Sequence, residues 1–203
     1  MVKIKICGIT TEEDIAYLNE AGVDFAGFVQ FYKKSRRNIE TALATRLMKG
    51  LDPRIKRVAV TVRPDREQLD AIWRAGFDIV QIHGDISGTL LDELPLPAWK
   101  AFNVTDLPHF ERYREHASVK GFVFDAVRPG SGEAFDWGIL EGLPRTDKLT
   151  LLAGGLRPDN VASALSRTCV DGVDTSSGVE RERGTGKDPG KIQAFVRAVR
   201  GDG

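Results

Sequence analysis

Three side chains that take part in proton chemistry occupy equivalent places along the sequence. Cys7 and His83 each precede a glycine at the end of a strand-like run, and Asp125 ends the apolar run 121–125. A glycine lets the backbone turn sharply, so these side chains are expected where strands pass into loops. An isolated cysteine is more often a buried structural residue. The repeated placement in one chain instead favours a shared functional rim.

The carboxyl group of Asp125 is poorly suited to the end of an apolar strand unless it has a chemical role. A desolvated carboxyl group holds its proton more readily than one in water, which suits a general acid. Asp125 is therefore a candidate acid, and the Cys7 thiol and the His83 ring are expected to face the same rim.

Small residues follow two later strand-like runs. Gly154 and Gly155 come after the first, and Ser177 and Gly178 come after the second. Backbone amides in such turns, next to a short helix N-terminus, can hold a phosphate. Each motif alone is also typical of an ordinary tight turn, but the pair at successive strand ends predicts a phosphate site. The basic segment 30–38 offers a second anion-binding loop, although such a run is more often a solvated surface.

Regular alternation of strand-like and helix-like segments sets where these residues lie. The sequence predicts strands at 3–7, 23–29, 56–62, 77–83, 98–103, 119–125, 148–153 and 172–175. Helices are expected from Thr10 or Thr11 to Gly22, at 41–48, 64–75, 89–93, 106–116, after a start at 135–137, and at 158–166 and 187–200.

This order predicts an α/β protein, a compact single-domain (β/α)₈ TIM barrel over residues 1–203, with roughly 25 residues in each unit. Active sites of that fold lie at the carboxyl ends of the strands, and the loops after strands seven and eight often hold phosphate. Cys7, His83 and Asp125 would then meet at one mouth despite their separation in the chain.

Composition narrows the class of protein. Among the 203 residues, Lys plus Arg and Asp plus Glu each total 29, which argues against nucleic acid or an acidic membrane as the main partner. No apolar run reaches the roughly 20 residues of a membrane span, and no signal peptide is evident. Two cysteines and three histidines do not form a disulfide framework or a usual zinc motif. We expect a cytoplasmic protein with metal-free chemistry.

Several longer motifs resemble one family, the phosphoribosylanthranilate isomerases of tryptophan biosynthesis, along nearly the whole chain. The matching segments are KICGIT at 5–10, VQIHG at 80–84, FDW at 135–137, LAGGL at 152–156 with PDNV at 158–161, GVDTSSGVE at 172–180, and the Lys187-Asp188 and Lys191-Ile192 pairs.

The resemblance implies an Amadori rearrangement of N-(5'-phosphoribosyl)anthranilate, without metal or organic cofactor. Asp125 would be the general acid and Cys7 the general base. Arg37 would bind the anthranilate carboxylate, and His83 and Asp174 would orient the substrate or tune the acid and base. For Asp174 a hydrogen bond within the barrel wall is an equal alternative. The implied phosphate ligands are Gly154, Gly155, Ser177 and Gly178.

Two alternatives stay open from the sequence. The histidine-pathway phosphoribosyl isomerase performs a similar aldose-ketose reaction, but it is expected to carry a carboxylate where this chain has Cys7. A non-catalytic sugar-phosphate-binding barrel would need only the glycine turns and the basic loop, so it leaves both Cys7 and Asp125 unexplained. The apolar pattern does not distinguish a monomer from a homodimer.

Overall fold

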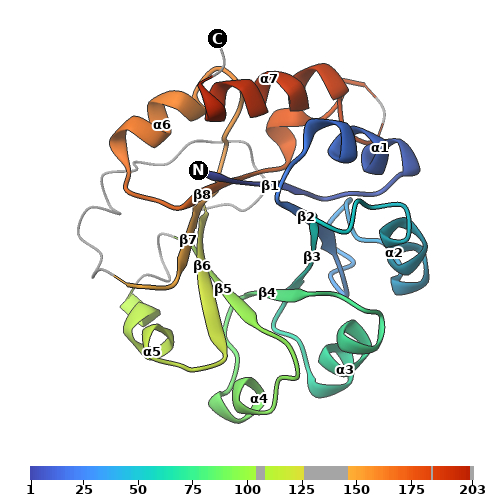
Figure 1. Cartoon of the computed structure of the whole chain (residues 1–203). Helices are drawn as coiled ribbons and strands as arrows, with labels where there is room; N and C mark the ends of the chain where they lie inside the picture. The colour runs from blue at the N-terminus through green and yellow to red at the C-terminus, as the bar shows by residue number, and fades with distance from the viewer. Residues whose placement is uncertain (104–107, 126–145, 184, 202–203) are drawn as a thin grey trace.

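The computed structural model describes residues 1–103, 108–125, 146–183 and 185–201. Its centre is a closed barrel of parallel strands in chain order, as predicted (Figure 1). The strands are β1 (Lys3–Cys7), β2 (Phe25–Val29), β3 (Lys56–Val62), β4 (Ile79–His83), β5 (Ala98–Asn103), β6 (Val119–Asp125), β7 (Leu149–Leu152) and β8 (Gly172–Thr175).

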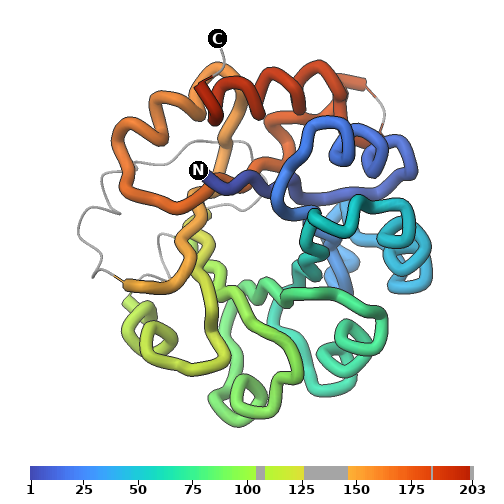
Figure 2. Tube along the Cα trace, in the orientation of Figure 1, coloured from blue at the N-terminus to red at the C-terminus, as the bar shows by residue number. Residues whose placement is uncertain are grey.

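Helices surround the barrel, and the C-terminal helix packs between the first helix and the one before it in the chain (Figures 1 and 2). None of the helices in the described ranges is long and apolar enough to cross a bilayer. The helices are α1 (Glu12–Ala21), α2 (Thr41–Met48), α3 (Arg66–Arg74), α4 (Gly88–Asp92), α5 (Phe110–Arg114), α6 (Val161–Arg167) and α7 (Pro189–Arg200), with a 3₁₀ helix at Ser177–Val179.

Capping side chains set where several helices begin. The Thr11 hydroxyl accepts a hydrogen bond from the Asp14 amide at 3.1 Å, and the Asp14 carboxylate accepts one from the Thr11 amide, so α1 starts with a capping box. Asp65 caps α3 in the same way, which places its start after the expected residue 64. Asp188 caps α7 and leaves Lys187 outside the helix that was expected to include it.

Two other expected helices differ from the structure. The helix expected at 106–116 is shorter in the structure: α5 spans Phe110–Arg114, after a 3₁₀ turn at 108–109 and before a turn at Glu115, and residues 104–107 lie outside the described ranges. The helix expected at 158–166 begins later, at Val161, because the preceding residues form a turn in which the Arg157 amide donates to the Asn160 side chain at 2.7 Å. The loop at 128–132 and the helix start at 135–137 also lie outside the described residues.

The alternation of side chains along each strand separates two apolar layers. Even-numbered residues of β1, such as Ile4 and Ile6, pack outward against the helices. The barrel interior holds a second cluster that includes Phe25, Trp99 and Leu151. Successive side chains of a strand point to opposite faces, so Lys5 and Cys7 share the inner face of β1 with this cluster.

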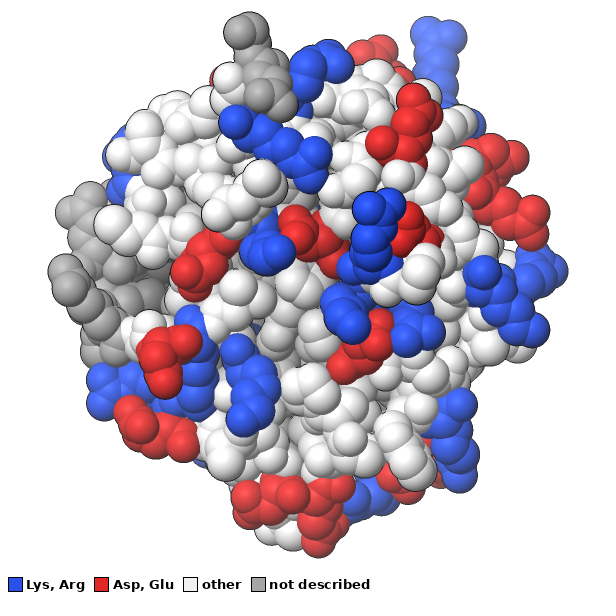
Figure 3. Space-filling model, in the orientation of Figure 1, with Lys and Arg blue, Asp and Glu red and all other residues white. Residues whose placement is uncertain are grey.

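Acidic and basic residues are mixed on the visible face of the molecule (Figure 3). Acidic and basic side chains alternate over the face shown in Figure 3, without a large region of one sign. This agrees with the equal numbers of acidic and basic residues in the sequence. The surface on view therefore has no strongly basic groove of the kind that binds nucleic acid.

We predict that Gly172→Ala destabilises the barrel by about 1–3 kcal/mol through overpacking. A Cβ atom at Gly172 would lie 2.6 Å from both the Lys3 carbonyl oxygen and the Leu151 side chain, and the carbonyl belongs to the paired backbone of β1. Denaturant unfolding measures the loss. Gly88→Ala is the control, since a Cβ there meets nothing within 4 Å; equal stability of the two variants would contradict the packing argument.

Candidate active site

A cavity of about 780 Å³ opens at the carboxyl ends of the strands. Its walls come from the ends of β1 to β8 and from the loops that follow them. This is where the barrel was expected to place its site. The predicted residues that line it are Cys7, Arg37, His83, Asp125, Gly154, Gly155, Asp174 and Ser177.

Gly178 is the predicted site residue that lies beside the cavity wall instead of in it. A Cβ atom at Gly178 would lie 2.0 Å from the Leu156 carbonyl oxygen. That carbonyl also accepts a hydrogen bond from the Thr175 hydroxyl at 2.7 Å. The absence of a side chain at Gly178 thus brings the loops after β7 and β8 together.

The loop after β7 depends on glycine for its path. Gly154 and Gly155 have φ angles of +84° and +66°, a left-handed conformation that costs other residues free energy. The Asn160 side chain donates a hydrogen bond to the Gly155 carbonyl oxygen at 3.0 Å and holds the turn in place. The turn faces the cavity beside Ser177, which begins the 3₁₀ helix after β8. Amides in this arrangement suit a phosphate group.

Cys7 lies above a buried ion pair in the barrel interior. The Lys5 ammonium group donates to Asp174 Oδ2 at 2.7 Å, with the Lys5 side chain fully buried and the Asp174 side chain 7% exposed. Burial alone would lower the pKa of Lys5, but the charges of Asp174 and Cys7 raise it above its ordinary value, so Lys5 is a cation. The hydrogen bond within the barrel wall that was one alternative for Asp174 is therefore present.

The second oxygen of Asp174 faces a different environment. Asp174 Oδ1 is buried and has no hydrogen-bond partner among the described residues, and Asp174 also lines the cavity. An unpaired buried carboxylate oxygen is costly unless something donates to it. Asp174 Oδ2 thus accepts a hydrogen bond from Lys5 in the barrel interior, and Oδ1 can accept one from a ligand.

Burial dominates the ionisation of the Cys7 thiol. Desolvation raises its pKa above the ordinary value, and the nearby Asp174 carboxylate acts in the same direction. Lys5 and Lys187 oppose this because a positive charge stabilises the thiolate. The carbonyl oxygen of Cys7 accepts a hydrogen bond from the Ser176 hydroxyl at 2.9 Å, which ties the end of β1 to the end of β8.

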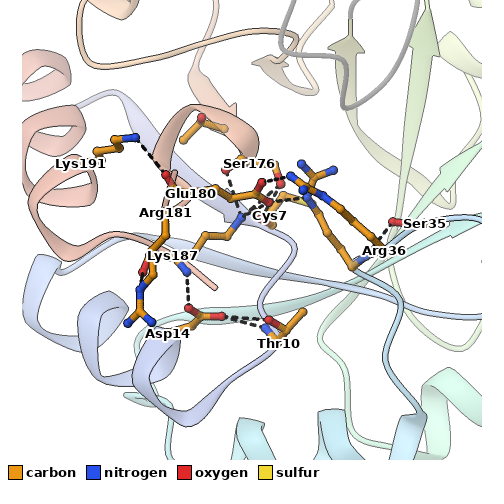
Figure 4. Close-up of polar contacts among 12 residues, drawn as sticks. Cys7, Thr10, Asp14, Ser35, Arg36, Ser176, Glu180, Arg181, Lys187 and Lys191 are labelled. Carbon is orange, nitrogen blue, oxygen red and sulfur yellow. Dashed lines mark hydrogen bonds and ion pairs between the residues drawn. The ribbon is translucent and has the colours of Figure 1, made fainter. Parts of the chain in front are cut away.

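Arg37 is held in place by a carboxylate that the sequence did not identify as a site residue. Its Nε donates to Glu180 Oε1 at 2.6 Å. Arg36 forms a second ion pair with the same carboxylate (Figure 4). The Arg37 side chain also crosses Gly8, where a Cβ atom would lie 2.4 Å from Arg37 Cδ. Glycine at position 8 is therefore required both by its φ of +78° and by the arginine above it.

Glu180 is ionised because of its basic neighbours. Burial alone would raise its pKa, but the hydrogen bond from Arg37 and the charges of Lys187, Arg37 and Arg36 lower it below the ordinary value. Glu180 follows the serine-glycine segment after β8, so its place in the motif was visible in the sequence. Its partners were not, because Arg36 and Arg37 come from the loop after β2 and Lys187 from the segment before α7.

Lys187 is a second buried lysine that connects the site to α1. Its ammonium group donates to the Ser176 carbonyl oxygen at 3.1 Å and lies 3.4 Å from Glu180 Oε1, while its backbone amide donates to Asp14 Oδ1 at 2.7 Å (Figure 4). Asp14 is the residue that closes the capping box of α1. The Asp14 carboxylate thus holds the Thr10 and Thr11 amides of the loop after Cys7 with one oxygen and the Lys187 amide with the other.

His83 is uncharged in this site. Burial, together with the positive charges of Lys100 and Lys5, lowers the pKa of the ring from 6.5 to about 3. Gln81 Nε2 lies 3.1 Å from His83 Nε2, and because an amide nitrogen only donates, the ring nitrogen accepts and the proton resides on Nδ1. The ring therefore offers a hydrogen-bond donor without a charge.

Asp125 completes the wall at the end of β6. It pairs in register with Asn103 at the end of β5, and both line the cavity. Cys7 lies on the same cavity with β7 and β8 between them around the barrel. Within the described ranges, no group of three or more His, Cys, Asp or Glu side chains could hold a metal ion.

Comparison with known proteins identifies the family. Residues 4–198 match the family model described as N-(5'phosphoribosyl)anthranilate (PRA) isomerase. A protein of that name from Geotalea uraniireducens is 40% identical over 206 aligned positions, covering 99% of this chain and 100% of the relative.

Solved structures agree with this match. The dimeric enzyme of Thermotoga maritima, crystallised as monomers, superposes with a TM-score of 0.86 at 34% identity, covering 99% of this chain and 100% of that one. An isomerase in complex with reduced 1-(o-carboxyphenylamino)-1-deoxyribulose 5-phosphate gives the same TM-score, identity and coverage. The chain therefore belongs to the N-(5'-phosphoribosyl)anthranilate isomerase family.

Proposed function

We propose that this chain converts N-(5'-phosphoribosyl)anthranilate into 1-(2-carboxyphenylamino)-1-deoxy-D-ribulose 5-phosphate, a step of tryptophan biosynthesis. The observation that carries the proposal is the convergence of Cys7, Asp125 and the glycine turns on one cavity in a chain of this family. The reaction is an aldose-ketose isomerisation, which needs an acid, a base and a place for a phosphate and a carboxylate. Residues 1–203 would act as one isomerase domain.

Asp125 and Cys7 divide the proton transfers between them. Asp125 protonates the ribose ring oxygen, so the ring opens to a cationic Schiff base between C1 and the anthranilate nitrogen. Cys7, as the thiolate, then removes the proton from C2 and gives an enolamine, which tautomerises to the ketone. The cationic Schiff base acidifies the C2 proton, and such acid-base assistance contributes on the order of 10²–10⁴ in rate per group.

Two anion sites hold the ends of the substrate. The turn at Gly154 and Gly155, with Ser177 and Gly178, takes the phosphate. Arg37 takes the anthranilate carboxylate: its Nε is engaged by Glu180, so its terminal nitrogens are the donors it presents. Glu180 thereby orients the guanidinium group and reduces the freedom that binding would otherwise have to remove.

His83 and Asp174 are proposed to contact the ribose between these ends. The neutral His83 ring donates from Nδ1, and the unpaired Asp174 Oδ1 accepts from a hydroxyl group. Both groups face a site that already contains Lys5 and Lys100, so a charged histidine would be unfavourable there.

The assembly and location of the chain are proposed from its relatives. The Thermotoga maritima relative is dimeric and was also crystallised as monomers. We infer that this chain works as a monomer or a homodimer on a small-molecule substrate in the cytoplasm, where amino-acid precursors are made.

The decisive experiment follows anthranilate-type fluorescence while the purified protein acts on freshly generated phosphoribosylanthranilate. Loss of fluorescence that persists after chelator treatment is expected, since the proposed acid and base are side chains. A parallel assay with the histidine-pathway aminoaldose tests the related isomerase. Turnover of that substrate alone would identify the chain as the histidine-pathway isomerase. A folded protein that turns over neither substrate would be a non-catalytic sugar-phosphate-binding barrel.

Cys7→Ser is expected to lower kcat by at least about a hundredfold with KM nearly unchanged, because a serine hydroxyl does not ionise near neutrality. The same fluorescence assay measures both constants. Cys169→Ser is the matched control, because Cys169 is exposed and far from the motif. Full activity of Cys7→Ser would remove Cys7 as the base.

Asp125→Asn is expected to lower kcat by a similar factor, because an amide cannot transfer a proton to the ring oxygen. A substrate analogue whose ring is already open should bind the variant as well as it binds the unchanged protein. Asp92→Asn, on the outer helix α4, is the control. Near-normal turnover by Asp125→Asn would overturn the role of the acid.

His83 is expected to stay neutral well below its ordinary pKa. Since folding lowers that pKa from 6.5 to about 3, the neutral ring contributes stability above pH 6.5, and this contribution is lost as the pH falls toward 3. Ring ¹⁵N shifts, assigned with His83→Gln, should show Nδ1 protonated and no titration between about pH 8 and about pH 5. Titration near the ordinary pKa would contradict the neutral donor.

A further inference from the structure

The proposed reaction assigns roles to Cys7 and Asp174 but none to Lys5, which lies next to both. It lies two positions before Cys7 on β1, so both side chains point into the barrel. In the pairing of β1 with β8, Lys5 is opposite Asp174, and the two charges form the buried ion pair below the cavity. Burying a charged pair costs free energy unless its geometry is good, so an ion pair inside the barrel requires a reason.

Gly27 shows how closely Lys5 approaches the thiol. Gly27 faces Cys7 in the pairing of β1 with β2. A Cβ atom at Gly27 would lie 3.0 Å from Cys7 Sγ and 3.2 Å from Lys5 Cε. The sulfur atom and the end of the lysine side chain therefore share the space that the missing side chain leaves. A side chain at position 27 of β2 would occupy this shared space, and glycine leaves it open.

Within the described part of the chain, three charged groups act on the ionisation of Cys7 from the elements around it. Lys5 comes from β1 itself, Asp174 from β8, and Lys187 from the segment before α7. Both lysines are paired with a carboxylate, Lys187 with Glu180 at 3.4 Å at the rim and Lys5 with Asp174 at 2.7 Å inside the barrel, so the pairing alone does not distinguish them. Lys5 is the cation with a direct approach to the sulfur, and Asp174 keeps it protonated in the barrel interior.

We propose that Lys5 is a positioning residue for the base: its ammonium group, fixed by Asp174 and admitted by Gly27, stabilises the thiolate of Cys7. The inference rests on the proposed role of Cys7. Burial would otherwise hold the thiol in its protonated form, and a fixed cation against the sulfur increases the fraction that is ready to take the C2 proton. If Lys5 and Asp174 were both neutral, Lys187 would be the cation left to stabilise the thiolate.

The test measures the thiolate directly. Iodoacetamide alkylation of Cys7 is followed against pH by mass spectrometry in a Cys169→Ser background, so that a single cysteine reacts. Lys5→Met is compared with Lys3→Met. Lys3 lies on the same strand, but its side chain is partly exposed and is paired with Asp24. We expect alkylation at neutral pH to be at least about tenfold slower in Lys5→Met and unchanged in Lys3→Met, because one close charge is worth at least a tenfold change in ionisation.

Lys5→Met leaves a buried carboxylate without its partner, which can prevent folding. The double variant Lys5→Met with Asp174→Asn replaces the ion pair by two neutral groups and should fold. Its alkylation should still be slower than that of the unchanged protein, but less slow than in Lys5→Met, because the Asp174 carboxylate that raises the pKa of Cys7 is gone as well. The pKa of Cys7, read as the midpoint in the pH dependence of kcat/KM, should also be higher in Lys5→Met than in the unchanged protein. An unchanged midpoint of alkylation in the folded double variant would overturn the proposal.

The alkylation result is independent of turnover. If Cys7 reacts as a Lys5-dependent thiolate but the protein does not isomerise phosphoribosylanthranilate, the proposed function fails and the ion-pair inference stands. If turnover requires Cys7 but the pH midpoint of its alkylation does not depend on Lys5, the proposed function stands and the ion-pair inference fails. A merely structural lysine would change stability without moving the pH midpoint.

Discussion

The pairing of β1 with β8 closes the barrel, and the site depends on this closure. It places Lys5 opposite Asp174 and brings the Ser176 hydroxyl to the Cys7 carbonyl oxygen, contacts between residues 169 positions apart in the chain. Neither the thiol nor the glycine turns have a defined environment until the first and last strands meet. A site built across the closing seam therefore exists only in the fully folded protein.

Fixed charges at this seam form two groups at different depths. The Lys5–Asp174 pair is buried in the barrel interior, whereas Glu180 pairs with Arg36, Arg37 and Lys187 at the rim. Buried ion pairs contribute little net stability because desolvation offsets the attraction. Their value here is orientation: a charge that is already placed before the substrate arrives requires no reorganisation when the reaction develops charge. The rim group aims an arginine, and the inner group places a cation under the thiol.

The alternation of eight strand-like and helix-like units was sufficient to predict the barrel, and the position of Cys7, His83 and Asp125 at strand ends was sufficient to predict their convergence on one mouth. The period of two along strands indicates Lys5, a charged residue on the inner face, although nothing local shows that Asp174 neutralises it. Glu180 and Lys187 could not be assigned in this way, because their contacts depend on loops from opposite parts of the chain. Helix ends were the weakest predictions: side-chain caps at Asp65 and Asp188 decided them.

Low polarity and fixed cations together explain why the site combines a neutral histidine with a reactive thiol. Burial disfavours every charged form, so His83 loses its proton and Cys7 tends to keep its own. The cations act on both groups in the same direction, against a protonated ring and in favour of a thiolate. One arrangement of lysines thus gives an uncharged donor and an ionisable base on the same cavity. A cavity without them would hold the same residues in less useful protonation states.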